Sequence, residues 1–456
     1  MHSSARSVWL AILPFLRLRF SDPTVHTMRL VRSIFLALLL LAGLVVPAAA
    51  QPTAIVGGTV HPVSGPEIEN GVVLLRGDTI AAVGPRSAVD VPSDARRIDA
   101  SGQVVTPGLM DAATATGLVE VSAVGSTRDN ALDTDDAIRA AFRVTDGINP
   151  NSVVIPVTRL GGVTTVASTP SGGAVAGQGA VIDLHGETIG EMLVRDRAAL
   201  YAAFTPGATE ATGEARGGLA MRLREAFEDA RFYAENRSAY RRGATRDLSM
   251  SRLDLEALAS TLDGEMPLVV RAARASDIDA ALRIAAEFDL DLRIEGGEEA
   301  WMRADRLAAA DVPVVVKALN NLPTEFDRLG TRFDNAARLA EAGVPVVIST
   351  FDTHNARTLR LEAGNAARFG LDRDAALRAV TLAPAQMLGV ADTHGSLTVG
   401  KTANVVVWSG DPFEPLTTVE HVFIGGTEMP DDSRQKRLLR RYDDLGDWPP
   451  GYDDGS

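Results

Sequence analysis

Hydrophobic and polar positions change their rhythm twice along the chain. From Thr53 to about Gln103, short apolar runs rich in β-branched residues are separated by Gly, Pro and Asp-Ser breaks, a pattern typical of strands and turns. From Asp111 to about Gly389, apolar runs alternate with stretches of helical spacing rich in Ala, Arg, Glu and Leu. After residue 393 the chain is again rich in β-branched runs and Gly turns, in GSLTVGKTANVVVWSGDPF and TVEHVFIGGTEM.

This alternation of strands and helices predicts a parallel sheet, and its length suits a (β/α)8 TIM-type barrel over residues 107–392. The segment 205–262 interrupts the alternation with charged helical sequence and is predicted to be a helical insertion over one face of the barrel. The two β-rich ends, 53–106 and 393–428, predict a small composite β-sandwich, and residues 430–456 a loosely attached charged tail. The predicted barrel strands, beyond the one near Asp111, are VVIPV, GVTTVAS, MPLVVRAA, LDLRIEG, VPVVVKA and GVPVVIST.

One Gly-rich stretch, STPSGGAVAGQGAVIDLHGET at 168–188, follows a predicted strand. It contains neither of the Gly motifs that bind nucleotide phosphates, so a nucleotide site is not expected. We interpret it as a mouth loop in which Gln178 and His185 are candidate substrate contacts.

The N-terminus carries the pattern of a secretory signal peptide. MRLVRSIFLALLLLAGLVVPAAAQ has a basic start at Met28, a short apolar run and an A-x-A site, which predicts cleavage after Ala50. The alternative is a transmembrane anchor, but the apolar run is short for a bilayer span. Residues 1–27 are then either sequence upstream of a start at Met28 or a long leader. We expect a secreted or periplasmic protein without a stable membrane span.

Composition narrows the function classes. The formal charge of −14 disfavours nucleic acid or an anionic membrane surface as the main partner, so we expect a small-molecule ligand or substrate. The chain has no cysteine, which removes thiol nucleophiles, thiolate zinc sites and disulfides.

Two motifs resemble the amidohydrolase superfamily, in its imidazolonepropionase-like or secreted dipeptidase-like branch. VVTPGLMDA is similar to the family's approach to barrel strand one, and LRAVTLAPAQMLGVADTHGSLTVGKTANVVVWSGDP to its closing helix and return to the sandwich. The resemblance implies the barrel-plus-sandwich fold and hydrolysis of carbon–nitrogen bonds by a metal-bound water.

The residues that would hold that metal are altered. The resemblance places the two histidines of the strand-one H-x-H motif on Ala113 and Ala115, and an alanine methyl cannot bind a metal. It places the strand-five histidine on or near Arg271. Of the seven histidines, only His185 and His354 fall in the predicted barrel. We therefore expect a degenerate metal site and no firm cofactor; the alternative is one divalent ion, such as Zn, on Asp111, Glu295 and Asp352.

The remaining candidates each have a functional and a structural interpretation. Asp352 could act as a base with His354 as proton shuttle, or it could cap the helix that follows. Arg271 and Lys317, at predicted strand ends, could clamp an anionic ligand or form internal ion pairs with Asp111, Glu295 or Asp352. For Asp111 we expect a structural hydrogen bond. Glu295, Glu298 and Glu299 could face the mouth or cap the next helix, and acidic residues in a first helical turn favour capping.

Two functions remain open. One is a divergent hydrolase that cleaves a C–N bond in a cyclic amide or small peptide-like substrate. The other is a catalytically inactive relative in the cell envelope that binds a ligand or pairs with an active paralogue. A homo-oligomer is compatible with both.

Overall fold

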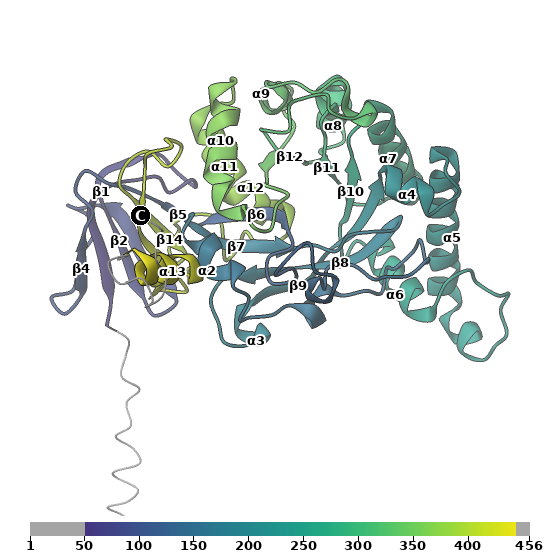
Figure 1. Ribbon diagram of the computed structural model, residues 1–456, viewed down its shortest axis with the longest axis horizontal. Coiled ribbons are helices and arrows are strands. Elements are labelled where there is room, and N and C mark those ends of the chain that lie inside the picture. Colours follow the sequence, from purple (N-terminus) through teal and green to yellow (C-terminus); the bar gives the residue numbers. More distant parts are fainter. Residues whose placement is uncertain (1–50, 444–456) are drawn as a thin grey trace, which may run out of the picture. The chain divides into compact units, whose positions relative to one another are not determined.

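The computed structural model describes residues 51–443, which form two eight-stranded sheets with helices packed around one of them (Figure 1). The predicted leader and signal peptide, and the end of the predicted tail, lie outside the described residues. No helix within residues 51–443 combines the length and apolarity that crossing a bilayer requires.

The first sheet is built from both ends of the chain, as expected for the composite sandwich. Its strand order is β16-β15-β14-β5-β1-β2-β3, with β4 paired to β1. The Ile80 N–H donates to the Lys401 carbonyl, so the β3 edge reaches back to the chain before β14 and one apolar core is enclosed. Its strands are β1 (Thr53–Val60), β2 (Ile68–Arg76), β3 (Thr79–Pro85), β4 (Arg96–Asp99), β5 (Val104–Pro107), β14 (Val405–Trp408), β15 (Val419–Ile424) and β16 (Thr427–Glu428).

The second sheet is the predicted barrel, nearly closed, with its strands in chain order from β6 to β13. Val269, Val315 and Val347 belong to one apolar cluster inside the barrel, whereas their sequence neighbours pack outward against the helices. The strands are β6 (Leu109–Thr114), β7 (Val163–Ser168), β8 (Val175–Asp183), β9 (Leu193–Phe204), β10 (Leu268–Ala272), β11 (Leu292–Gly296), β12 (Val314–Val316) and β13 (Val346–Ile348).

One strand of the barrel departs from the all-parallel pattern. β8 pairs antiparallel with both β7 and β9, whereas all other neighbouring pairs are parallel. The connection from Ser168 to Val175 is too short for the crossover that a parallel strand needs, so the chain turns back directly. The interpretation of residues 168–188 as a loop is therefore wrong for residues 175–183, which form the largely buried strand β8.

A second correction concerns VVIPV at 153–157, which is helical rather than a strand. It lies in α2, which begins at Val154, and Pro156 falls in the first turn, where its missing N–H costs no helical hydrogen bond. The run of β-branched residues favoured a strand, but the proline in its middle is the stronger signal.

The segment 205–262 is helical and contains α4, α5 and α6. In Figure 1 the insertion helices α5 and α6 lie on the side of the barrel away from the β-sandwich. The helices are α2 (Val154–Arg159), α3 (Ile189–Met192), α4 (Pro206–Glu210), α5 (Arg216–Arg241), α6 (Arg252–Leu262), α7 (Ala275–Phe288), α8 (Ala304–Ala309), α9 (Asn335–Glu341), α10 (Leu359–Arg368), α11 (Arg373–Ala379), α12 (Leu382–Met387) and α13 (Arg434–Tyr442). Short 3-10 turns are η1 (Gly125–Thr127), η2 (Val144–Gly147), η3 (Ala300–Arg303), η4 (Phe326–Arg328) and η5 (Ala356–Thr358).

Candidate functional site

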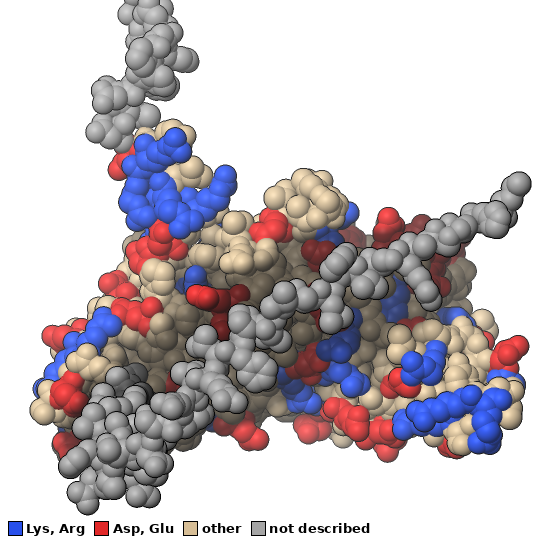
Figure 2. Space-filling view, turned by 90° about the horizontal axis from the view of Figure 1, so that it is seen from below, with Lys and Arg blue, Asp and Glu red and all other residues tan. Residues whose placement is uncertain are grey.

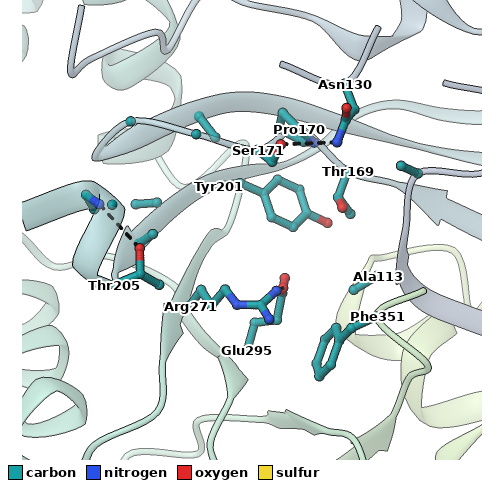
Figure 3. A pocket seen from close by; sticks show the side chains of 18 of the residues that line it. Ala113, Asn130, Thr169, Pro170, Ser171, Tyr201, Thr205, Arg271, Glu295 and Phe351 are labelled. Carbon is teal, nitrogen blue, oxygen red and sulfur yellow. Dashed lines mark hydrogen bonds and ion pairs between the residues drawn. The ribbon is translucent and has the colours of Figure 1, made fainter. Parts of the chain in front are cut away.

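A cavity of about 530 Å³ opens where the barrel strands β6, β9, β10 and β11 end. Its walls also come from the turn before β8 and from the segment after β13. Because the carboxyl ends of barrel strands carry the variable loops, this is the face on which barrel enzymes build their sites. The residues labelled in the close-up of this cavity are Ala113, Asn130, Thr169, Pro170, Ser171, Tyr201, Thr205, Arg271, Glu295 and Phe351 (Figure 3).

The polar centre of this cavity is an ion pair between neighbouring strands. Arg271 on β10 stands directly opposite Glu295 on β11 in the parallel register. Arg271 Nη1 lies 3.0 Å from Glu295 Oε1; the side chain of Arg271 is 48% exposed and that of Glu295 only 8%. Figure 3 shows the guanidinium and the carboxylate turned toward each other across the cavity floor. One of the internal ion pairs expected for Arg271 is therefore confirmed.

Burial sets the protonation of this centre. It raises the pKa of Glu295 above its ordinary value, because the charge and hydrogen bond of Arg271 offset only part of the desolvation. Burial also raises the pKa of the Tyr201 hydroxyl, and the negative charge of Glu295 raises it further. Tyr201 therefore stays neutral and can donate a hydrogen bond into the cavity.

An aromatic ring holds the guanidinium from the other side. The Arg271 guanidinium carbon lies 5.1 Å from the centre of the Phe351 ring, a distance typical of cation–π contact. Phe351 has a φ of 47°, in the left-handed region that non-glycine residues seldom adopt. Phe351 lies in the wall of the same cavity as Arg271, so it belongs to the site together with that residue.

Ala113 and Ala115 lie in the wall of the same cavity. The sequence positions of the strand-one motif thus face the site, but they present only methyl groups. Within residues 51–443, no three His, Cys, Asp or Glu side chains are grouped so that they could share a metal ion. The side chains at this mouth therefore do not fit the zinc centre that the resemblance implies.

Asp111 is buried at the seam between β6 and β13. Its carboxylate accepts hydrogen bonds from the Ser349 hydroxyl, from the Thr350 hydroxyl at 2.5 Å and from the Ala113 N–H at 3.3 Å. Burial raises its pKa to about 6, and these hydrogen bonds hold it from rising further. The structural hydrogen bonding expected for Asp111 is confirmed: it ties the first barrel strand to the last.

Asp352 and His354 lie in the turn between β13 and η5, beside the cavity rather than in its wall. The Asp352 carboxylate accepts N–H bonds from His354 at 2.9 Å and from Asn355 at 3.0 Å, and the Asn355 amide at 3.1 Å. Burial pushes the pKa of Asp352 up, but these hydrogen bonds and the charge of Lys317 outweigh it and hold the pKa below its ordinary value. His354 Nε2 lies 2.9 Å from the Glu120 carbonyl oxygen. The Asp352 carboxylate thus closes the turn before η5 and is not a side-chain cap of η5 or α10. The two side chains are held by separate backbone partners.

The other sequence candidates are not brought together. Lys317 follows β12, and its charge lowers the pKa of Asp352 and opposes the raised pKa of Glu362. Gln178 is buried in β8, where its amide donates to the Ala140 carbonyl and accepts from Arg197 Nε. His185 follows the far end of β8, where burial and the charge of Arg159 lower its pKa. None of the three lies in the cavity wall. For Gln178 and His185 the reason is that β8 runs opposite to its neighbours.

Glu299 caps a different helix from the one expected. Its carboxylate accepts the N–H of Ala275, the first residue of α7, and the N–H of Gly330, both at 2.9 Å. Glu298 accepts from the Asn320 amide and is largely buried, which raises its pKa. Both side chains support the mouth loops.

Tyr201 and Phe351 were missed by the sequence reasoning. β9, which carries Tyr201, was not predicted as a strand, although alternation in LYAAF was a usable signal. Phe351 could not be identified from the sequence, because nothing in the sequence indicates that a non-glycine residue adopts a left-handed φ.

Comparison with known proteins matches this architecture. The sequence model described as the amidohydrolase family matches residues 284–429. An amidohydrolase from Thermotoga maritima MSB8 is 30% identical, with a TM-score of 0.76 over 83% of this chain and 99% of that one. An adenosine deaminase from Xanthomonas campestris, solved with bound Zn, is 19% identical with a TM-score of 0.51, over 85% of this chain and 96% of that one, and shows the shared fold.

Among curated proteins, amidohydrolase tasK of Hapsidospora irregularis is 25% identical over 375 residues, which is 76% of this chain. The chain spans only 38% of the length of tasK.

Proposed function

Because the chain belongs to the amidohydrolase family, we propose that the cavity at its barrel mouth binds a small organic molecule, and that it does so through the Arg271–Glu295 pair rather than through a metal-bound water. The observation that carries the proposal is that these two charges share one cavity with Ala113 and Ala115. At the positions where the family resemblance expects metal-binding histidines, this chain offers two methyl groups and a guanidinium.

Electrostatics supports this arrangement. A divalent cation near Arg271 would be repelled by a fixed positive charge that already neutralises the nearest carboxylate. Arg271 and Glu295 are also the only charged side chains in the cavity wall among the described residues. The same pair that disfavours a cation can orient a neutral or anionic ligand by hydrogen bonds.

Surface charge supports a small ligand rather than nucleic acid. On the face seen in Figure 2, acidic and basic side chains are interspersed, and the basic ones gather only in small groups. Together with the net charge of −14, this gives no extended basic surface on the part of that face that the described residues present.

A second candidate function is hydrolysis of a C–N bond in a cyclic amide or small peptide-like molecule. It is favoured by membership of a family whose solved relatives carry the names amidohydrolase and deaminase. In this chain Asp352 would be the base, and its low pKa keeps it ionised. Asp352, however, lies beside the cavity and not in its wall, whereas Arg271 and Glu295 line it, which is why we favour binding through that pair.

The test is metal content together with turnover. Protein purified without chelator should contain far less than one equivalent of Zn or Mn, and should not turn over a panel of hydantoins, lactams and dipeptides with or without added metal. Stoichiometric metal that is lost in Asp352→Ala, or metal-dependent turnover, would establish the hydrolase instead.

The proposal extends to location and partners. We place the mature protein in the secreted or periplasmic compartment on the basis of the pattern at residues 28–50, which N-terminal sequencing of exported protein can test. A binding-only member of the family would act alone, as a homo-oligomer, or beside an active paralogue; co-purification from the native envelope distinguishes these.

A further inference from the structure

The Arg271 guanidinium is only partly used by the protein. Nη1 donates to Glu295, and no other hydrogen bond of this side chain is found among the described residues. The side chain is 48% exposed and lies in the cavity wall, so its remaining nitrogens are open to the cavity. Figure 3 shows the guanidinium reaching into the open space between Tyr201 and Phe351. The site therefore offers a free donor edge.

The position of this donor edge is fixed in advance. Glu295 anchors one nitrogen, and the Phe351 ring lies 5.1 Å from the guanidinium carbon, so the plane of the fork cannot swing freely. A guanidinium that is already oriented loses less conformational freedom when it binds a planar oxyanion.

The charges of the cavity select among oxyanions. A single guanidinium, already shared with Glu295, leaves little net positive charge for a dianion such as phosphate. A monocarboxylate matches the fork geometry and carries one charge. The other side chains of the wall are uncharged, and the methyl and hydroxyl groups among them suit a small uncharged body on that carboxylate: Ala113, Ala115, Ala176, Thr114, Thr169 and Thr205.

We propose that the barrel-mouth cavity is a carboxylate-binding site for small organic monoacids, in which Arg271 holds the carboxylate and Glu295 weakens the binding by its neighbouring negative charge. This inference rests on the proposed function, because it requires a mouth without metal. It predicts that removing the charge of Arg271 weakens binding of the acid and that removing the charge of Glu295 strengthens it. An ion pair with a purely structural role would not produce these opposite effects on binding.

The test uses phenylacetate and its neutral isostere phenylacetamide, titrated by calorimetry into the full-length mature protein in EDTA. Phenylacetate should bind and phenylacetamide should bind at least about tenfold more weakly. Glu295→Gln keeps the size and an oxygen for Arg271 but removes the charge, so phenylacetate should bind about tenfold more tightly. Arg271→Gln should abolish the preference for phenylacetate over phenylacetamide. Arg271→Lys keeps the positive charge but not the planar guanidinium, and it should retain part of this preference.

Arg332→Gln is the matched control. Its guanidinium also stacks on an aromatic ring, Trp301 at 5.0 Å, and pairs with Asp334, but it lies outside the cavity. Its binding should equal that of the wild type, and circular dichroism checks the folding of each variant.

The outcomes separate the two proposals. Equal binding of acid and amide in EDTA, or weaker acid binding in Glu295→Gln, overturns the carboxylate inference while a metal-free site stands. Acid binding that appears only when Zn is restored overturns the metal-free site itself.

Discussion

Arg271 and Glu295 face each other from adjacent parallel strands, 3.0 Å apart between Nη1 and Oε1, with the carboxylate buried and the guanidinium half exposed. This asymmetry means that the two partners depend on each other unequally. Without Arg271, Glu295 would be a buried charge without a partner, whereas Arg271 without Glu295 would still reach solvent.

The first prediction is that Arg271→Met destabilises the fold at neutral pH. We expect a loss toward the lower end of the roughly 3–5 kcal/mol that breaking a buried ion pair costs, because one partner is half exposed. The folded-state pKa of Glu295 is already raised, and it rises further in the variant. The loss should therefore shrink as pH falls and Glu295 takes up a proton.

Urea unfolding at pH 5 and pH 7.5 measures this loss. The double variant Arg271→Met/Glu295→Leu, which leaves no buried charge, should regain most of the stability. A double variant that is less stable than Arg271→Met would contradict this account of the pair.

Asp111 leads to a prediction about pH alone. Its folded-state pKa of about 6 exceeds its ordinary value of 3.8, so the folded state binds this proton more tightly than the unfolded state does. The contribution to stability is fully present below pH 4 and is lost as pH rises through 6, with an amplitude of about 3 kcal/mol. Asp111→Asn cannot titrate and should lack this component.

The measurement is the difference in unfolding free energy between Asp111→Asn and the wild type from pH 4.5 to 8. That difference should move in favour of the variant as pH rises. Ser349→Ala removes one donor that stabilises the charged carboxylate, so in it the transition should shift to higher pH. Parallel pH profiles of wild type and Asp111→Asn would refute the assignment.

The parts of the fold that follow a regular period could be predicted from sequence. GVTTVAS, MPLVVRAA, LDLRIEG, VPVVVKA and GVPVVIST all contain barrel strands, because buried parallel strands read as continuous apolar runs. β8 and β9 were not predicted, because glycines in β8 and charges at the start of β9 obscure both strands.

The residues of the site could be predicted from sequence only where the register of neighbouring strands decides which side chains lie together. Arg271 and Glu295 were singled out because each ends a predicted strand, and their register brings them together. The wrong placement of Gln178 and His185 has one cause: an antiparallel strand carries its C-terminal end to the opposite side of the barrel. That reversal depends on the short connection between Ser168 and Val175, and the apolar pattern of the strand itself carries no sign of its direction.

The turn after β13 yields a third prediction. Asp352→Ala should cost about 1 kcal/mol of stability, as loss of a carboxylate that accepts backbone N–H groups does, and Asp352→Asn less, because its amide oxygen can still accept the N–H groups of His354 and Asn355. Binding of phenylacetate should be unchanged in both variants. Thermal unfolding and calorimetry measure the two effects. If a substrate is found and Asp352→Asn abolishes its turnover without loss of stability, Asp352 is a catalytic base instead.

The last prediction concerns rebuilding a metal site. If Arg271 is what opposes a cation at this mouth, restoring histidines at positions 113 and 115 alone should not give tight zinc binding. The triple variant Ala113→His/Ala115→His/Arg271→His removes the positive charge, supplies three imidazoles and leaves Glu295 free as a fourth ligand. It should therefore bind about one Zn per chain, while the double variant that keeps Arg271 binds at least about tenfold more weakly. Mass spectrometry of metal content after gel filtration, and cobalt absorption spectra that report tetrahedral coordination, measure both variants. Equal zinc affinity of the double and triple variants would show that the histidines, and not the charge of Arg271, decide whether this mouth holds a metal.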